Sequence, residues 1–330
     1  MPNDNLYMVW KDEVYKHTSG CNIHFQEQNG KYVKSNSNGS NNSVNIYVTT
    51  MAKNRDYFDQ FNVPIDLVIV DECLTVQNKD TKWTIKAFMS VSRAKFGVLM
   101  LSATFFRTRF DKLLFMLKML NTGLPERQEY LDTILNTAIN LNIKTTNRIW
   151  QNNIIRIDLP VTLSTDYTNA TTISDSKMKY IKCKEIINRL DWLQILLTVT
   201  RHLVSLGKKV LCYVDSQNDI DKLKTQNNND VYIYDKTNDE VINKNICVIS
   251  KYRGTYGINN LVGYDTIVLR PIESDKIPQI KGRLDRPGQK SKNLEINFII
   301  VNKSIEELDI TKIDIANNFY NSHILPIAIN

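Results

Sequence analysis

The chain has 330 residues, of which 42% are hydrophobic, 9% aromatic and 23% charged, an ordinary globular composition with room for two domains. It contains no run of about 18 apolar residues and does not open on a basic stretch followed by an apolar one, so we expect neither a membrane protein nor a secreted one. The net charge of +7 and the pI near 9.0 favour a polyanionic partner.

Cysteine and histidine spacing gives no sign of disulfide or zinc chemistry. The five cysteines are odd in number, widely separated and never paired as C-x-x-C, a pattern that favours a reducing, intracellular compartment. The four histidines are scattered and show no metal-ligand spacing.

Short β-branched runs alternate with longer amphipathic segments along the first part of the chain. Strands are predicted at 44–50, 65–72 and 96–104, with helices at 52–61 and 81–93. This alternation is typical of a parallel sheet whose crossover connections are helical.

A second series of strands follows, predicted at 208–215, 230–235, 245–250, 265–270 and 294–301. The intervening segments are long enough for the helical crossovers that parallel strands need. The sequence therefore predicts two α/β lobes.

The expected domain organisation has three parts. Residues 1–125 form a first lobe, residues 126–190 a helical insertion and linker, and residues 191–330 a second lobe. An Asn/Ser/Gly-rich run at 32–43 is expected to be a flexible surface loop.

Two adjacent carboxylates, Asp71 and Glu72, follow an apolar strand. Ligands of open α/β sheets gather at the carboxyl ends of strands, so these acids are placed to hold a phosphate-bound Mg²⁺ and to orient an attacking water. The alternative is a pair of solvated acids that opens the next helix.

The next strand ends in Ser102, Ala103 and Thr104. Their short hydroxyl side chains can exchange hydrogen-bond partners with little movement and so couple a bound γ-phosphate to the neighbouring lobe. The commoner role of such residues is to cap the helix that follows.

A glycine-containing loop follows the strand at 245–250. Glycines let a backbone approach a ligand closely, and exposed N–H groups can hold phosphate oxygens. The candidate contacts in and beside this loop are Gly254, Gly257, Asn259, Lys251 and Arg253.

The segment QIKGRLDRPGQK at 279–290 carries Arg283 and Arg286 three positions apart. On a helical turn this spacing directs both guanidinium groups to one face, which would bind an anion. A solvated basic helix end is the alternative.

DECL, LSAT, RGTYGIN and QIKGRLDRPGQ occur in the order and spacing of motifs of helicase superfamily two. The last, followed by NFIIVNKSIEELD at 297–309, resembles the Swi/Snf-type family of DNA-translocating ATPases. Six positions match that family's signature Q-x-x-G-R-x-x-R-x-G-Q: Gln279, Gly282, Arg283, Arg286, Gly288 and Gln289. The segments at 5–17 and 46–58 also resemble the family.

The resemblance implies two RecA-like lobes with parallel sheets flanked by helices, ATP and Mg²⁺ as cofactors, and double-stranded DNA as the partner. It implies nucleotide chemistry at Asp71 and Glu72, arginine fingers at Arg283 and Arg286, and coupling through 102–104. The implied nucleotide contacts are Gly257, Asn259, Gln279 and Gly282, and the implied DNA contacts are Thr50, Lys251, Arg253 and Thr255.

The chain departs from the family in what it lacks. No G-x-x-x-x-G-K-[ST] loop occurs in the 330 residues, so we expect the first lobe to be truncated at its N-terminus. The chain is then a fragment, a part completed by another polypeptide, or a degenerate relative. Leu74 replaces a histidine that couples the lobes, and TFFRTRF at 104–110 replaces Thr-Pro-x-Gln-Asn.

Three functions remain open. The first is a double-stranded DNA translocase that hydrolyses ATP, the second a catalytically inactive DNA-binding or interaction protein, and the third a strand-separating helicase. The heavy use of Asn, Lys and Ile suits an AT-rich genome such as that of a large DNA virus.

Overall fold

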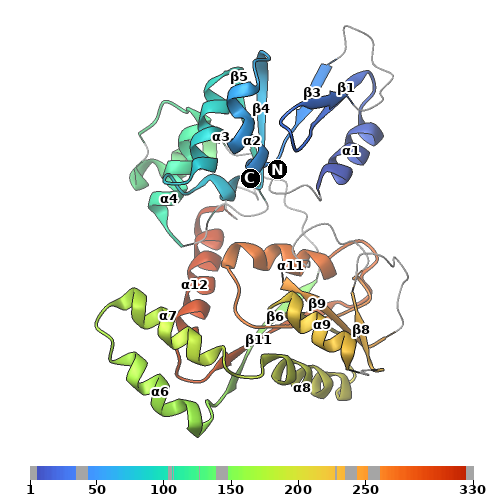
Figure 1. The fold of residues 1–330 in the computed structure, drawn as a ribbon, viewed down its shortest axis with the longest axis vertical. Helices are drawn as coiled ribbons and strands as arrows, with labels where there is room; N and C mark the ends of the chain where they lie inside the picture. Colours follow the sequence, from blue (N-terminus) through green and yellow to red (C-terminus); the bar gives the residue numbers. More distant parts are fainter. Residues whose placement is uncertain are drawn as a thin grey trace. The chain divides into compact units, whose positions relative to one another are not determined.

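The computed structural model of the protein describes residues 6–34, 44–102, 106, 108–125, 127–138, 148–226, 229–234, 244–251 and 261–324 (Figure 1). The chain divides into two compact units. Unit 1 comprises Met1–Asn142 with Asn318–Asn330, and unit 2 comprises Ile143–Asn317. Each unit has its own core.

Unit 1 begins with helix α1 and a small mixed sheet of order β2-β1-β3, in which β1 pairs antiparallel with β2 and parallel with β3. Val14 of α1 packs with Ile23 of β1 and Val48 of β3 in a small core. The elements are α1 (Leu6–His17), β1 (Cys21–Gln26), β2 (Tyr32–Lys34) and β3 (Val44–Val48).

The rest of unit 1 is built on the parallel pair β4–β5. Alternate residues of these strands, Val68, Val70, Val98 and Met100, face a core shared with the helices and with Phe319. The elements are α2 (Met51–Tyr57), β4 (Ile65–Asp71), α3 (Lys82–Ser92), β5 (Ala94–Leu101), α4 (Phe110–Leu117) and α5 (Leu131–Ala138).

Unit 2 contains a six-stranded parallel sheet of order β6-β11-β10-β7-β9-β8. Its inner strands are buried along their whole length, as expected for a parallel sheet covered on both faces. The strands are β6 (Ile149–Ile157), β7 (Val210–Val214), β8 (Val231–Ile233), β9 (Ile246–Ser250), β10 (Thr266–Leu269) and β11 (Asn293–Val301).

Helices cover both faces of this sheet. α11 and α12 pack on the face that includes Tyr213 and Phe298, and α8 and α9 pack on the face that includes Val214 and Ile299. Figure 1 shows α11 and α8 on opposite sides of the sheet. The helices are α6 (Val161–Thr171), α7 (Ser176–Ile187), α8 (Trp192–Ser205), α9 (Gln217–Thr225), α11 (Ile277–Leu284) and α12 (Glu306–Phe319).

The predicted α/β fold with parallel strands is confirmed, and each predicted strand and helix has a counterpart in the described residues. Two local expectations are wrong. Within the expected helical segment 126–190, Ile149–Ile157 is a strand, because it pairs with β11 over nine residues. Within the expected loop 32–43, Tyr32–Lys34 is a strand paired with β1, and residues 35–43 lie outside the described ones.

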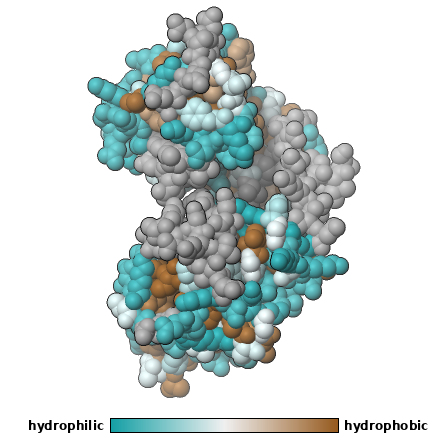
Figure 2. Space-filling view, turned by 90° about the vertical axis from the view of Figure 1, so that its right-hand side faces the viewer, coloured by the Kyte–Doolittle hydropathy of each residue, from teal (hydrophilic) through white to brown (hydrophobic). Residues whose placement is uncertain are grey.

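Hydrophilic residues predominate on the face shown in Figure 2, and hydrophobic residues form separate patches there. Among the described residues no helix is long and apolar enough to cross a membrane.

Candidate functional site

Asp71 is the last residue of β4, at the carboxyl end of the parallel pair. The indole Nε1 of Trp10 donates to its Oδ2 at 3.3 Å, and the backbone N–H of Glu72 donates to its Oδ1 at 3.0 Å. A carboxylate has about four acceptor positions, so these two bonds orient Asp71 and leave acceptor capacity on both oxygens.

Glu72 has a left-handed backbone, with φ 51° and ψ 52°. This conformation is strained for a residue with a Cβ and costs on the order of 1–3 kcal/mol. It turns the chain sharply between β4 and the following turn at Cys73–Val76. Strain held at a strand end that carries two acids is typical of a functional site.

Ser102, at the end of β5, hydrogen-bonds Cys73 beside the acids. Burial raises the pKa of the Cys73 thiol to about 12, with the charge of Glu72 adding to the effect, so this cysteine is an inert packing residue. Register places Asp71 opposite Leu101, and the two predicted motifs therefore meet at one edge of the sheet. Ala103 and Thr104 lie outside the described residues.

Thr50, a predicted DNA contact, is the N-cap of α2. Its side chain accepts from the backbone N–H of Lys53 at 3.2 Å, and Thr50 is only 3% exposed. The capping role accounts for its position. Its contact with DNA stays a prediction.

Lys251, another predicted DNA contact, points into unit 2. Its Nζ lies 2.6 Å from Asp215 Oδ1, and its side chain is largely buried. Burial alone would raise the pKa of Asp215, but Lys251 and Arg270 together hold it below its ordinary value. Lys251 thus serves an ion pair at the carboxyl ends of β7 and β9 in this structure.

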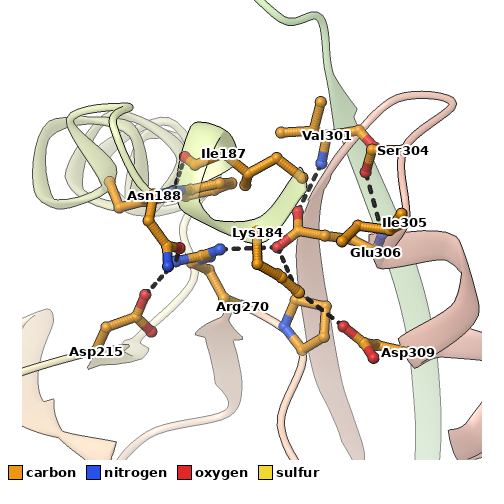
Figure 3. A network of polar contacts seen from close by, with 12 residues as sticks. Lys184, Ile187, Asn188, Asp215, Arg270, Val301, Ser304, Ile305, Glu306 and Asp309 are labelled. Atoms are coloured by element: carbon orange, nitrogen blue, oxygen red, sulfur yellow. Dashed lines mark hydrogen bonds and ion pairs between the residues drawn. The ribbon is translucent and has the colours of Figure 1, made fainter. Parts of the chain in front are cut away.

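Arg270 joins this pair to a larger network (Figure 3). It donates to Asp215 at 2.5 Å, to Asn188 at 3.1 Å and to Glu306 at 2.8 Å, and its guanidinium lies 3.9 Å from the centre of the Trp192 ring. Arg270 follows β10, so the network spans the carboxyl ends of three strands.

Glu306, the first residue of α12, is fully buried. Lys184 donates to its Oε1 at 3.0 Å and the backbone N–H of Val301 donates to its Oε2 at 3.0 Å, in addition to the bond from Arg270 (Figure 3). A buried carboxylate with three charge-assisted or backbone bonds fixes the start of α12 on the sheet.

The predicted arginine pair is placed differently from expectation. Arg283 lies on α11 and is 7% exposed, whereas α11 ends at Leu284 and Arg286 lies beyond it. The two side chains therefore do not share one helical face. Pro287 follows Arg286 and disfavours helical backbone at the residue before it, which ends the helix.

The Nε of Arg286 donates to the carbonyl of Gly282 at 2.8 Å. Gln279, another predicted nucleotide contact, is half-buried on α11. A Cβ added at Gly282 would meet open space. The remaining predicted contacts, Gly254, Gly257, Asn259, Arg253 and Thr255, lie outside the described residues.

Among the described residues no group of three His, Cys, Asp or Glu side chains could hold a metal ion by itself. All five cysteines are free and buried. A metal at Asp71 would therefore depend on ligands from a bound nucleotide or water.

Sequence reasoning missed the residues that orient these sites. Trp10 bonds Asp71, Arg270 and Glu306 form the centre of the network, and Arg148 bonds Asp285 next to Arg286. The signals were present but ambiguous, since Trp10 and Glu306 lie in segments noted only for their resemblance to the Swi/Snf family.

Comparisons with known proteins agree with a helicase fold. No family model matches the chain. The L115 protein of Acanthamoeba polyphaga mimivirus, which is named as a helicase, is 39% identical over 338 residues, covering 99% of this chain and 25% of that protein. This chain thus spans about a quarter of that relative's length.

Among solved structures, a variant of S. cerevisiae Dbp5 bound to RNA and ADP–BeF3 matches 96% of this chain and 73% of its own chain, with a TM-score of 0.50 and 11% identity. The protein therefore has the α/β architecture of RecA-like helicase lobes. In sequence it is similar, over nearly its whole length, to a part of a mimivirus protein named as a helicase.

Proposed function

We propose that residues 1–330 form part of the motor of a Swi/Snf-type ATPase that translocates on double-stranded DNA. The observation that supports this best is the meeting of Asp71, the strained Glu72 and Ser102 at the carboxyl edge of β4–β5. Such an edge is where α/β proteins bind nucleotides. The similarity to a mimivirus protein named as a helicase agrees with this class.

Asp71 is suited to bind Mg²⁺ through the water molecules that surround the ion. Its donors are an indole and a backbone N–H, which leave oxygen acceptors for the hydration shell of a hard cation. When bound with ATP, Mg²⁺ would neutralise charge on the phosphates. Glu72 would orient and deprotonate the attacking water. Arg286, with Arg283, would stabilise the negative charge that develops on the phosphoryl group during its transfer.

Hydrolysis also needs a phosphate-binding loop, which residues 1–330 do not contain. We propose that additional polypeptide supplies it as a strand and helix added at β5. The support is a bare apolar face: Leu67, Ile69 and Leu99 are 50%, 48% and 46% exposed on a parallel pair that should be covered on both faces.

Crossover handedness agrees with this position. The β4–α3–β5 connection puts α3 on the covered face, where Ala87 and Phe88 pack. If a strand is added on the free side of β5, the connection that follows it crosses the sheet in the direction from β5 towards β4. This is opposite to the direction of the β4–α3–β5 connection. The right-handed crossover helix of the added strand would therefore lie on the opposite, bare face.

The test is Glu72→Gln in the full gene product, with ATP hydrolysis measured with and without duplex DNA. Loss of a group that positions and deprotonates water should lower kcat by about 10²–10⁴-fold. Duplex DNA should stimulate the parent protein. Glu129→Gln is the matched control, because Glu129 is an exposed acid of the same unit and should leave kcat unchanged.

An unchanged kcat in Glu72→Gln would contradict the assignment of Glu72. Stimulation by RNA and not by duplex DNA would leave an ATPase but reject the translocase assignment. RNA is included in the test because a solved structure of similar fold has RNA bound.

A second candidate is a catalytically inactive DNA-binding or interaction protein. The absence of the phosphate-loop sequence from residues 1–330 favours it. ATP hydrolysis by the full gene product separates the two: turnover would reject the inactive candidate, and absence of hydrolysis beside intact DNA binding would support it.

A further inference from the structure

Three side chains on one face of β6 lie against α11. Arg148 directly precedes the strand, and Trp150 and Asn152 follow at alternate positions, so the three share a face. Lys281 of α11 donates to Asn152 at 2.8 Å and lies 5.0 Å from the centre of the Trp150 ring. β6 is therefore bound to the helix that precedes Arg286.

Arg148 forms a clamp with the segment that follows α11. One of its nitrogens donates to Asp285 Oδ1 at 2.6 Å, and the other donates to the carbonyls of Arg286 and Gln289, both at 3.2 Å. The indole of Trp150 donates to the second oxygen of Asp285 at 3.1 Å. A single guanidinium thus joins a carboxylate to two backbone carbonyls.

This clamp determines how the backbone leaves α11. Asp285 is the C-cap with φ −85° and ψ 70°, and Gly288 has φ +99°, so regular helical bonding stops at Asp285, whose N–H still donates to the Lys281 carbonyl. Arg148 instead bonds two carbonyls of the turn beyond the helix, those of Arg286 and Gln289. Contacts from β6 therefore help to hold the backbone from which the Arg286 side chain extends, together with the bonds from the Gln289 side chain to the carbonyls of Tyr264 and Leu284.

Stability alone does not account for the clamp. The side chains of Arg148 and Asp285 are 19% and 15% exposed, and the cost of desolvating such a pair offsets much of its attraction. An apolar pair of similar volume would stabilise the segment about as well, but it would not set the direction of a backbone. A planar guanidinium that donates to three acceptors does set the direction of the backbone.

We propose that Arg148, Trp150 and Asp285 are positioning residues for Arg286. They hold the Arg286 backbone so that its guanidinium meets a phosphate in one orientation. The inference rests on the proposed function, in which Arg286 serves the transferring phosphate of ATP. The edge strand β6 lies outside every predicted motif, and this proposal gives it an effect on the rate of ATP hydrolysis.

The decisive experiment is a double-mutant cycle on ATP hydrolysis by the full gene product. Arg148→Lys keeps the positive charge but removes the planar guanidinium that bonds several acceptors at once. We expect kcat to fall about 10–100-fold and KM for ATP to stay within a factor of two of the parent value, as for a small misplacement of a catalytic group. In an Arg286→Ala background, Arg148→Lys should cause no further loss of kcat. Arg156→Lys is the control, because Arg156 on the same strand pairs with Glu307 at the exposed surface.

A second measurement does not depend on hydrolysis. Hydrogen exchange at the amides of Arg286 and Gln289 should accelerate at least about tenfold in Arg148→Lys of the 330-residue chain, and should be unchanged in Arg156→Lys. Trp150→Phe keeps the ring packing, removes one bond to Asp285 and should show a smaller acceleration in the same direction.

Unchanged exchange in Arg148→Lys would overturn the clamp, whether or not the protein hydrolyses ATP. Additive losses of kcat in the double variant would show that Arg148 acts independently of Arg286 and would also overturn the proposal. An Arg286→Ala variant with normal kcat, beside an inactive Glu72→Gln variant, would reject both this proposal and the arginine-finger role while preserving the ATPase.

Discussion

Glu306 and Glu307 are neighbours in the sequence, but their environments are opposite. Glu306 is fully buried and bonded to Arg270, Lys184 and the Val301 N–H, whereas the Glu307 side chain is 36% exposed and paired with Arg156 on the surface. Removing one partner of a buried pair leaves an uncompensated charge, and removing one partner of an exposed pair does not.

Glu306→Gln should therefore destabilise unit 2 by about 3–5 kcal/mol, while Glu307→Gln should cost about 0–1 kcal/mol. Urea unfolding of the two variants, followed by far-ultraviolet circular dichroism and by tryptophan fluorescence, measures both. Equal midpoints for the two variants would mean that Arg270 and Lys184 find other partners when Glu306 loses its charge.

At the scale of elements, β4 and β5 show a conflict between sequence and exposure. Their apolar residues run almost without interruption, which is typical of a strand covered on both faces, yet only the face with Val68 and Val70 is covered. Ile69 and Val70 are adjacent on β4, with exposures of 48% and 4%. They form a matched pair for testing what covers the other face.

In the 330-residue chain, Ile69→Thr should change the free energy of unfolding by less than about 1 kcal/mol, and Val70→Thr should cost about 1–3 kcal/mol because it buries a hydroxyl. In the full gene product, the cost of Ile69→Thr should rise above about 1 kcal/mol if further polypeptide covers the face. Urea denaturation of both proteins makes the comparison. The same small cost of Ile69→Thr in both would show that the face stays bare.

At the scale of the whole chain, acid stability should depend on carboxylates held by cations. Burial opposes ionisation of Asp215 and of Asp309, but Lys251 with Arg270 and Lys184 with Lys312 keep both pKa values below the ordinary one. A carboxylate with a lowered folded pKa contributes stability above its unfolded pKa, and this contribution is lost as the pH falls through the folded value.

Stability should accordingly be level near neutral pH and fall below about pH 4, where carboxylates of the unfolded chain become protonated. Asp215→Asn should lower stability at pH 7 and make the decline on acidification shallower. Urea midpoints between pH 7 and pH 3 give the two slopes. Parallel declines in both proteins would show that Asp215 does not contribute to the acid dependence.

Much of the fold was predictable because its signals are local. The buried strands of unit 2 are continuous apolar runs, and the segments between them are long enough for helical crossovers. β6 was missed because an edge strand mixes polar and apolar residues, as in IWQNNIIRI, and its pairing with β11 is not visible in its own sequence.

The candidate site divides in the same way. The sequence by itself determined that two acids end one strand, that Ser102 ends the next, and that a basic segment precedes the last strand of the second series, because each is a pattern of near neighbours. Only the tertiary structure decided that Arg286 lies beyond α11, that Lys251 points into an ion pair, and that Arg148 holds Asp285 from 137 positions away. Those contacts join residues that are distant along the chain, so no local pattern specifies them.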